Sequence, residues 1–481
     1  MGIKVVISTY FQKKFFYRAW HETCLYIKLR LGILCSTFHI TKRVKISKVE
    51  RIKSMNLELR KVAIRDIQFS QENKIIDGCL HVNPDTLEEL VLEDARVKSV
   101  SFDIARPGES TRIVPVKDVI EPRAKVDGET FPGLFREDMQ EAGEGTTYCL
   151  EGMAVTSTGP IVGFQEGVID MMGPGTEYTI YSQLCHLCMI IEKQDYVDQH
   201  DHEVVVRLAG IKVAKYLATL AFAYEDYRTE NYEWKSIGEK YAEYPELPKV
   251  VYVYNCMAQG LLHDTYFYGR DAKALVPTMV TPLEVMDGAI ISGNCVSPGS
   301  KTTTYMHQNN AVIRELFKIH GKEINFMGIV LNPLMTTLKE KFRDRMLTVR
   351  EVKMLGADGV VISQEGFGNP TTDLMIVCQE LEKNGIKTVI ITNEDAGVDG
   401  MSESLPDSVQ EANAIVSTGN SNATVMLPAM EHTIGNLKEV ERVCGGNVTS
   451  IQPDGRLLLE IHGIMGSHNL QGNTKLGAIT L

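Results

Sequence analysis

Strand-like and helix-like patterns alternate along the last third of the chain. Four β-rich runs (INFMGIVL, DGVVIS, KTVIIT and NAIVST) are separated by amphipathic helical stretches such as TTDLMIVCQELEKNG. This alternation is typical of a parallel sheet wrapped by helices. We therefore expect a doubly wound, mostly parallel sheet in the C-terminal region.

Shorter alternations dominate the N-terminal region. From Met55 to about Val126, apolar and polar residues alternate in runs that Pro and Gly interrupt, which predicts strands and loops. The stretch CLEGMAVTSTGPIVGFQEGVIDM predicts a strand pair with a hairpin turn at Thr158-Gly159. Apolar residues recur at helical spacing over 204–222, and a buried strand follows in PKVVYVY. The expected fold class is α/β, with a β-rich N-terminal region.

Composition narrows the class of protein. The chain has 481 residues, of which 44% are hydrophobic and 23% charged, as in ordinary globular proteins. Its ten cysteines show no disulfide-framework spacing, and no apolar run is long enough to span a membrane. These features indicate reduced thiols and a cytoplasmic protein, with no membrane partner.

Charge is distributed unevenly along the chain. Residues 1–54 hold twelve Lys or Arg and two acidic residues, whereas the remaining chain has a net charge of −22. Phosphate would be repelled over most of so acidic a body, so we expect no nucleic-acid partner. The basic stretch lacks the apolar core of a secretion signal. We interpret residues 1–54 as an extension outside the functional fold that begins at Met55; the alternative is an arm that recruits an acidic partner.

Two motifs suggest a metal or redox site, and neither is favoured. Cys185-His-Leu-Cys188 has suitable spacing, but its apolar setting predicts a buried strand and no second ligand pair completes the site. His200-Asp201-His202-Glu203 offers two imidazoles, but a helix starting there would splay them apart. We therefore predict no metal.

Two loops carry candidate binding residues. The loop GLLHDTYFYGR, which follows a buried strand, contains His263, Asp264, Tyr266 and Arg270. Arg270 has the planar geometry that binds a carboxylate in a bidentate manner. The second loop, SQEGFGNPTTD, contains Glu365 and follows a predicted parallel strand, at the sheet edge where ligands bind in such folds. The alternative is that both loops are structural turns.

The segment EVMDGAIISGNCVS contains an Asn294-Cys295 bond flanked by Gly288 and Gly293. Glycines allow the backbone to be strained and closely approached. A deprotonated Cys295 thiol can attack the preceding carbonyl and convert the amide into a thioester. Subsequent β-elimination would cut the chain and leave dehydroalanine, which hydrolyses to a pyruvoyl group. Such a ketone condenses with amines, as a Schiff-base cofactor does.

The same residues carry a resemblance to a known family. The segments ARPGES, PVKDVIEPR, GFQEGVIDM, GLLHDTY, EVMDGAIISGNCVS, HQNN, SQEGFGNPTTDL and LEIHGI lie between Met55 and about Asn469. This stretch resembles the α/β proprotein of component B of the glycine, sarcosine and betaine reductases. The resemblance implies cleavage between Asn294 and Cys295, with Cys295 as the pyruvoyl precursor. The two products would be an N-terminal segment, 55–294, and a C-terminal segment, 295–481. Within HQNN, His307 joins the candidate substrate-binding residues.

The resemblance also implies a reaction and a set of partners. The carbonyl at position 295 would activate an amine substrate for reductive C–N cleavage by a selenocysteine-containing subunit of component B. Selenoprotein A and component C would then lead to acetyl phosphate, with the thioredoxin system as the source of reductant. Divergence downstream of the cut, from Pro298 onward, leaves glycine, sarcosine and betaine all open as substrates. The alternatives are a D-proline reductase proprotein and an uncleaved α/β binding or scaffold subunit.

Overall fold

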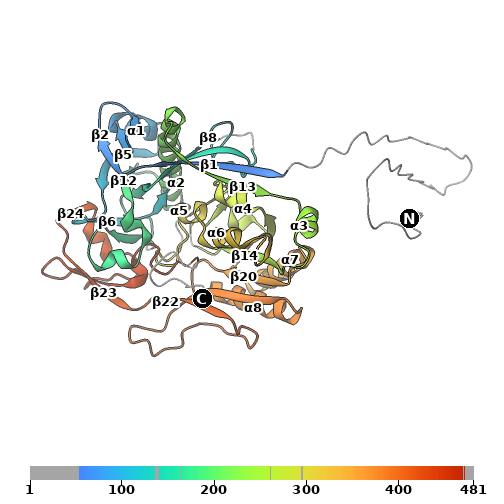
Figure 1. Cartoon of the computed structure of the whole chain (residues 1–481). Coiled ribbons are helices and arrows are strands. Elements are labelled where there is room, and N and C mark those ends of the chain that lie inside the picture. Colours follow the sequence, from blue (N-terminus) through green and yellow to red (C-terminus); the bar gives the residue numbers. More distant parts are fainter. Residues whose placement is uncertain are drawn as a thin grey trace, which may run out of the picture. The chain divides into compact units, whose positions relative to one another are not determined.

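The computed structural model describes residues 54–135, 140–163, 165–260, 262–293, 296–469 and 471. Residues 1–53, nearly all of the predicted extension, lie outside the described residues, and so do Asn294 and Cys295. The first strand begins at Met55, where the sequence pattern places the start of the fold (Figure 1).

The N-terminal half consists mainly of strands packed in small sheets. These strands are β1 (Met55–Ala63), β2 (Asp66–Phe69), β3 (Lys74–Ile76), β4 (Cys79–Val82), β5 (Val97–Ala105), β6 (Thr111–Val116), β7 (Asp118–Ile120), β8 (Arg123–Lys125), β9 (Gly145–Glu151), β10 (Met153–Thr158), β11 (Gly167–Asp170), β12 (Cys185–Lys193) and β13 (Arg228–Trp234). They are accompanied by the helices α1 (Pro84–Leu92), α2 (Gln199–Thr219) and α3 (Ile237–Glu243). Two sheets, of order β13-β1-β9-β8 and β5-β12-β10-β7, carry most of this half.

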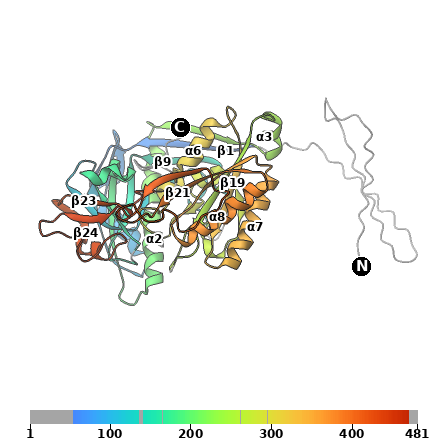
Figure 2. The same cartoon turned by 90° about the horizontal axis from the view of Figure 1, so that it is seen from below.

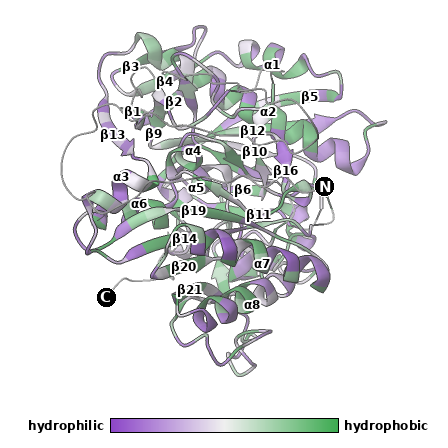
Figure 3. Cartoon of the chain, turned by 90° about the vertical axis from the view of Figure 1, so that its right-hand side faces the viewer, coloured by the Kyte–Doolittle hydropathy of each residue, from purple (hydrophilic) through white to green (hydrophobic). Residues whose placement is uncertain are grey.

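A larger sheet organises the C-terminal half. Its strands are β14 (Lys249–Met257), β17 (Thr278–Val280), β19 (Asn325–Leu334), β20 (Gly359–Ser363), β21 (Lys387–Glu394) and β22 (Ile415–Asn420). Their order is β17-β19-β14-β20-β21-β22, and all neighbours are parallel except β17, which runs antiparallel to β19. Figure 3 shows β19, β14, β20 and β21 in this order. The predicted α/β class and the mostly parallel C-terminal sheet are therefore confirmed.

The remaining elements surround this sheet. They are α4 (Pro282–Met286), α5 (Thr304–Gln308), α6 (Ala311–Ile319), α7 (Leu338–Met354), α8 (Asn369–Lys383), β15 (Tyr266–Phe267), β16 (Arg270–Asp271), β18 (Ile290–Ile291), β23 (Thr424–Leu427), β24 (His432–Gly435) and β25 (Leu457–Glu460). Helices α7 and α8 lie side by side on one face, where they share a hydrophobic core with β14, β19 and β20 (Figure 2). On the other face, α6 packs together with residues of β1 and β13. Because strands share the covering of that face, the doubly wound description is not confirmed.

Segments from both sides of the predicted cut share the same sheets. Strand β14 precedes position 294 in the sequence, yet it lies between β19 and β20, which both follow position 295. Likewise, β24 extends the early strand β6 by parallel pairing. The two predicted subunit segments are thus interlocked by main-chain hydrogen bonds.

The predicted hairpin at Thr158-Gly159 is wrong. Strand β10 pairs with β12 and β7, whereas β11 pairs with β6 in a different sheet. Gly159 instead permits a close approach, since a Cβ atom there would lie 2.2 Å from the carbonyl oxygen of Ile191. The glycine is therefore required by the close packing of the chain against β12 and not by a hairpin turn.

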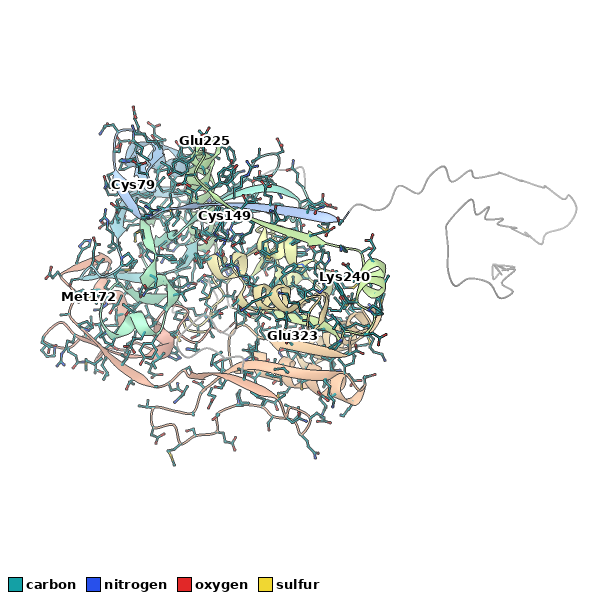
Figure 4. The ribbon with its side chains drawn as sticks, in the orientation of Figure 1. Cys79, Cys149, Met172, Glu225, Lys240 and Glu323 are labelled. Atoms are coloured by element: carbon teal, nitrogen blue, oxygen red, sulfur yellow. The ribbon has the colours of Figure 1, made fainter. Side chains whose placement is uncertain are left out.

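Side chains labelled in Figure 4 illustrate what the fold buries. Cys149 on β9 and Lys240 on α3 are both buried, whereas Glu225 and Glu323 are exposed. The Lys240 ammonium lies over the Trp234 ring and donates to the carbonyl oxygen of Phe326 at 3.0 Å. Burial lowers the pKa of Lys240 to about 6, with no carboxylate among its described contacts.

Candidate active site

Described residues on both sides of the predicted cut are buried in the protein. We call residues 292–304 the central segment; Asn294 and Cys295, which lie within it, are outside the described residues. Strand β18 leads into Ser292 and Gly293, and the chain continues from Val296 to the start of α5. Val296 and residues 300–304 are all buried. Buried backbone must find hydrogen-bond partners, so the neighbours of this segment define the site.

Gly293 lies directly against the loop that precedes β15. A Cβ atom at position 293 would lie 2.0 Å from the carbonyl oxygen of Asp264 and 2.6 Å from that of His263. Pairing of β15 with β18 fixes this approach, because Tyr266 lies opposite Ile291. Only glycine fits such a contact, and the loop containing His263 and Asp264 therefore lies next to the predicted cut.

Asp264 is a buried carboxyl beside this contact. Its Oδ1 accepts from the backbone N–H of Gly260 at 2.9 Å, and its Oδ2 lies 3.3 Å from the ammonium of Lys273. Burial nevertheless raises the pKa of Asp264 to about 7, which Lys273 only partly opposes. A carboxyl that titrates near neutral pH is suited to donating and accepting protons.

Glu365 joins three segments at the carboxyl ends of β14 and β20. It accepts from the backbone N–H of Met257 at 3.0 Å, the hydroxyl of Thr265 at 2.7 Å and the backbone N–H of Thr302 at 3.1 Å. Burial raises the pKa of this carboxyl, while the three donors act in the opposite direction. Glu365 therefore lies at the sheet edge that the sequence predicted, and it holds the central segment there.

The N-terminal half holds the other side of the central segment. Asp118 on β7 accepts from the backbone N–H of Thr304 at 3.0 Å and from its hydroxyl at 2.6 Å, and burial raises the pKa of Asp118 to about 6. The Thr304 hydroxyl accepts in turn from the N–H of Ser292 at 3.1 Å. Lys301 donates to the carbonyl oxygen of Lys117 at 2.7 Å. No local pattern in the sequence singles out Asp118 or Lys301, because their partners lie more than 180 residues away.

On the C-terminal side, a thiol and an imidazole lie close to the central segment. The Cys444 thiol lies 3.7 Å from the Ser297 hydroxyl and 3.9 Å from Nε2 of His462, which lies 3.4 Å from a Glu460 carboxylate oxygen. Burial lowers the pKa of His462, which favours its neutral, proton-accepting form. His462 lies in the LEIHGI segment that carries the family resemblance, but no role was predicted for it from the sequence.

The other predicted residues take different positions. His263 lies 3.4 Å from the Asp271 carboxylate, and the buried Tyr266 lies under the Arg207 guanidinium at 3.9 Å. Arg270 is exposed on β16 and forms no ion pair within the described part of the chain. His307 is buried in α5, with Nδ1 2.7 Å from the Tyr254 hydroxyl. Burial lowers the pKa of His307 to about 3, so it is neutral at physiological pH.

Two further findings concern metals and membranes. Within the described ranges, no group of three or more His, Cys, Asp or Glu side chains is arranged to hold a metal ion. Cys185 and Cys188 lie on the buried strand β12, as predicted, and His202 and Glu203 are buried in α2.

None of the helices in the described part combines the length and hydropathy that a membrane crossing requires.

Comparisons with known proteins place the chain in a family. Residues 55–479 match the family of glycine/sarcosine/betaine reductase component B subunits. The chain is 47% identical over 430 residues to the glycine reductase complex component B subunits alpha and beta of Acetoanaerobium sticklandii, covering 89% of this chain and 100% of that protein. It is 44% identical to a sarcosine reductase component B subunit alpha (88% and 99% covered) and 36% identical to a betaine reductase one (84% and 95% covered), both from Peptoclostridium acidaminophilum. No solved structure matches significantly.

The mixed α/β fold and these relatives define a component of a multi-subunit oxidoreductase. The chain belongs to the family of glycine/sarcosine/betaine reductase component B subunits.

Proposed function

We propose that this chain is the proprotein of the substrate-binding subunits of such a reductase and is cut between Asn294 and Cys295. The observation that carries the proposal is the packing around this bond. Gly293 is pressed against the backbone of His263 and Asp264 on one side, while Glu365 and Asp118 anchor the residues that follow. A self-cleaving bond needs a fixed backbone and nearby proton acceptors, and the described neighbours supply both.

The residues around the cut also fit the expected pyruvoyl group. Once formed from Cys295, it supplies a ketone that condenses with an amine and withdraws electrons from the neighbouring C–N bond. Asp264, with its pKa raised to about 7, and His462, with its pKa lowered, are groups of this chain able to move protons, and they contact described residues on either side of the cut. Glu365 and Asp118 would hold the new N-terminal segment in place.

The interlocked sheets explain how a cut chain would remain one protein. Because β14 lies between β19 and β20, the segments 55–294 and 295–481 stay paired after the bond is broken. The family match begins at residue 55, which supports our view that residues 1–54 are not part of the functional fold. The seven described cysteines are all free, which supports a location in the reducing cytoplasm.

The proposed reaction is reductive C–N cleavage of glycine, sarcosine or betaine, completed by partner proteins. We expect a selenocysteine-containing subunit, selenoprotein A and component C as partners, with acetyl phosphate as the product and thioredoxin as the source of reductant. Tyr266 offers limited room for a quaternary ammonium, since Arg207 already covers one ring face. We therefore favour glycine or sarcosine over betaine.

Denaturing mass spectrometry of the purified full chain tests the cut. We expect two masses that meet at position 295, phenylhydrazine labelling confined to the C-terminal fragment, and elution of both fragments as one species under native conditions. Cys295→Ala should abolish cleavage and labelling, whereas Cys378→Ala, a buried cysteine on α8, should leave both intact. A single intact mass from the wild-type chain would instead favour an uncleaved scaffold subunit.

The substrate is tested by reconstitution. Activity of the processed protein with its partner components should be measured in parallel with glycine, sarcosine, betaine and D-proline. Turnover of D-proline alone would overturn the proposed substrate class while leaving the cleavage proposal standing.

A further inference from the structure

Helix α7 is fixed to the protein mainly by its inner side. Val349 and Val352 pack into the core beneath the sheet, and Lys341 forms a buried ion pair with Asp373 of α8. The Thr348 hydroxyl donates to the Asn332 side chain of β19 at 3.1 Å. The outer side of α7 is therefore not needed to hold the helix in place.

That outer side carries large apolar side chains. Leu338, Phe342 and Met346 are 58%, 47% and 56% exposed, and Met354 at the helix end is 67% exposed. A spacing of four residues places the first three along one side of the helix. Isolated exposed apolar residues are ordinary, but a contiguous row of them is typical of a surface that another molecule covers.

The same face is basic on an otherwise acidic body. Four Lys or Arg side chains of α7 are exposed (Lys339, Arg343, Arg350 and Lys353) and none of its acidic side chains is, whereas the chain after residue 54 has a net charge of −22. Arg350 and Lys353 line a shallow depression of about 380 Å³ between α7 and α8, together with Met346 and Met354. The Arg345 guanidinium lies 5.2 Å from the centre of the Phe342 ring.

We propose that the outer face of α7, centred on Phe342 and Met346, docks an acidic protein partner that presents apolar side chains among carboxylates. Aromatic residues, Met and Arg are the types enriched in protein interfaces, and all three are present here. The positive charge on this face complements an acidic surface. Relatives of this chain are components of multi-subunit complexes, so the occupant we assign is another component of the reductase. The inference does not depend on the cleavage at position 295.

The test uses the full chain and the other protein components of the reductase, each purified. Binding of each component to the immobilised chain is measured for wild type, for Phe342→Ser/Met346→Ser and for Arg350→Glu/Lys353→Glu. We expect one component to lose affinity by about tenfold or more with either pair of substitutions, and its binding to weaken with added salt. The matched controls Met401→Ser and Lys318→Glu, at exposed positions elsewhere, should change affinity less than about twofold.

Thermal melts and denaturing gels accompany the binding data. All variants should melt with the wild type, because they alter exposed side chains, and should be cut as the wild type is. Unchanged affinity in both α7 variants would overturn the proposal, as would the absence of any binding component. A different outcome is a concentration-dependent dimer in sedimentation that only Phe342→Ser/Met346→Ser abolishes. That result would assign the surface to a second copy of the chain and would also overturn the proposal. None of these results bears on the cut itself.

Discussion

Gly293→Ala tests whether the close contact beside the predicted cut governs processing. The added methyl carbon would lie 2.0 Å from the Asp264 carbonyl oxygen and 2.5 Å from its carbonyl carbon, distances that real Cβ atoms do not reach. Both neighbours are main-chain atoms held by the β15–β18 pairing, so no side-chain rotation relieves the overlap. The backbone on one side must move by about 1 Å, and a misplacement of this size costs catalysis roughly 100-fold.

The expected result is slow cleavage in a folded protein. Overpacking of this kind destabilises a protein by about 1–3 kcal/mol, which comparison of Gly293→Ala/Cys295→Ala with Cys295→Ala measures without interference from the cut. The cleavage rate, followed by intact mass over time, should fall about 100-fold. Gly238→Ala is the matched control, since nothing lies within 4 Å of its added Cβ atom in α3. Cleavage of Gly293→Ala at the wild-type rate would refute the reasoning.

Three further substitutions test the described network. Burial raises the pKa of Asp118 from 3.8 to about 6. Its contribution to the free energy of unfolding is therefore complete below about pH 4, and about 3 kcal/mol of it is lost as the pH rises through 6. The wild type should accordingly melt above Asp118→Asn at low pH, and this difference should shrink over that range. Lys341→Met leaves the Asp373 carboxylate buried without its partner and should lower the free energy of unfolding, measured by thermal melts, by about 3–5 kcal/mol. The double variant Lys341→Met/Asp373→Leu should recover most of this loss. Equal stability of the two variants would contradict the reasoning. Glu365→Gln replaces a carboxylate oxygen that accepts hydrogen bonds with an amide N–H₂, which then faces a donor, and should lower the free energy of unfolding by about 1–3 kcal/mol. The exposed control Glu403→Gln should melt at the wild-type temperature.

The periodicity of apolar residues correctly predicted several strands and helices of the fold. The runs DGVVIS and KTVIIT became the parallel strands β20 and β21, because buried parallel strands are continuously apolar. The helix predicted over 204–222 is α2, which starts earlier because Asp198 caps it with a side-chain bond to the N–H of Asp201. The turn at Gly159 failed because a glycine signal does not distinguish a hairpin from a close approach.

The candidate site could be predicted only in part, for a related reason. His263, Asp264 and Glu365 could be singled out because each follows a strand in a polar loop. Their alignment around the central segment depends on contacts between residues far apart in sequence. Asp118 reaches Thr304 across 186 positions, and Cys444 reaches Ser297 across 147. No pattern within a window of the sequence carries such pairings, so this part of the site became visible only in the folded chain.

The order of folding and cleavage follows from the topology. Strand β14 can lie between β19 and β20 only when the chain before position 294 and the chain after 295 have folded together. Glu365 also meets Met257, Thr265 and Thr302 only in that folded state, and these contacts fix the segment beside the predicted cut. The packing of the described residues on both sides of the predicted cut is therefore a product of the complete fold. A cut made afterwards separates the chain without separating the sheet, so the two fragments are expected to keep the structure that produced them.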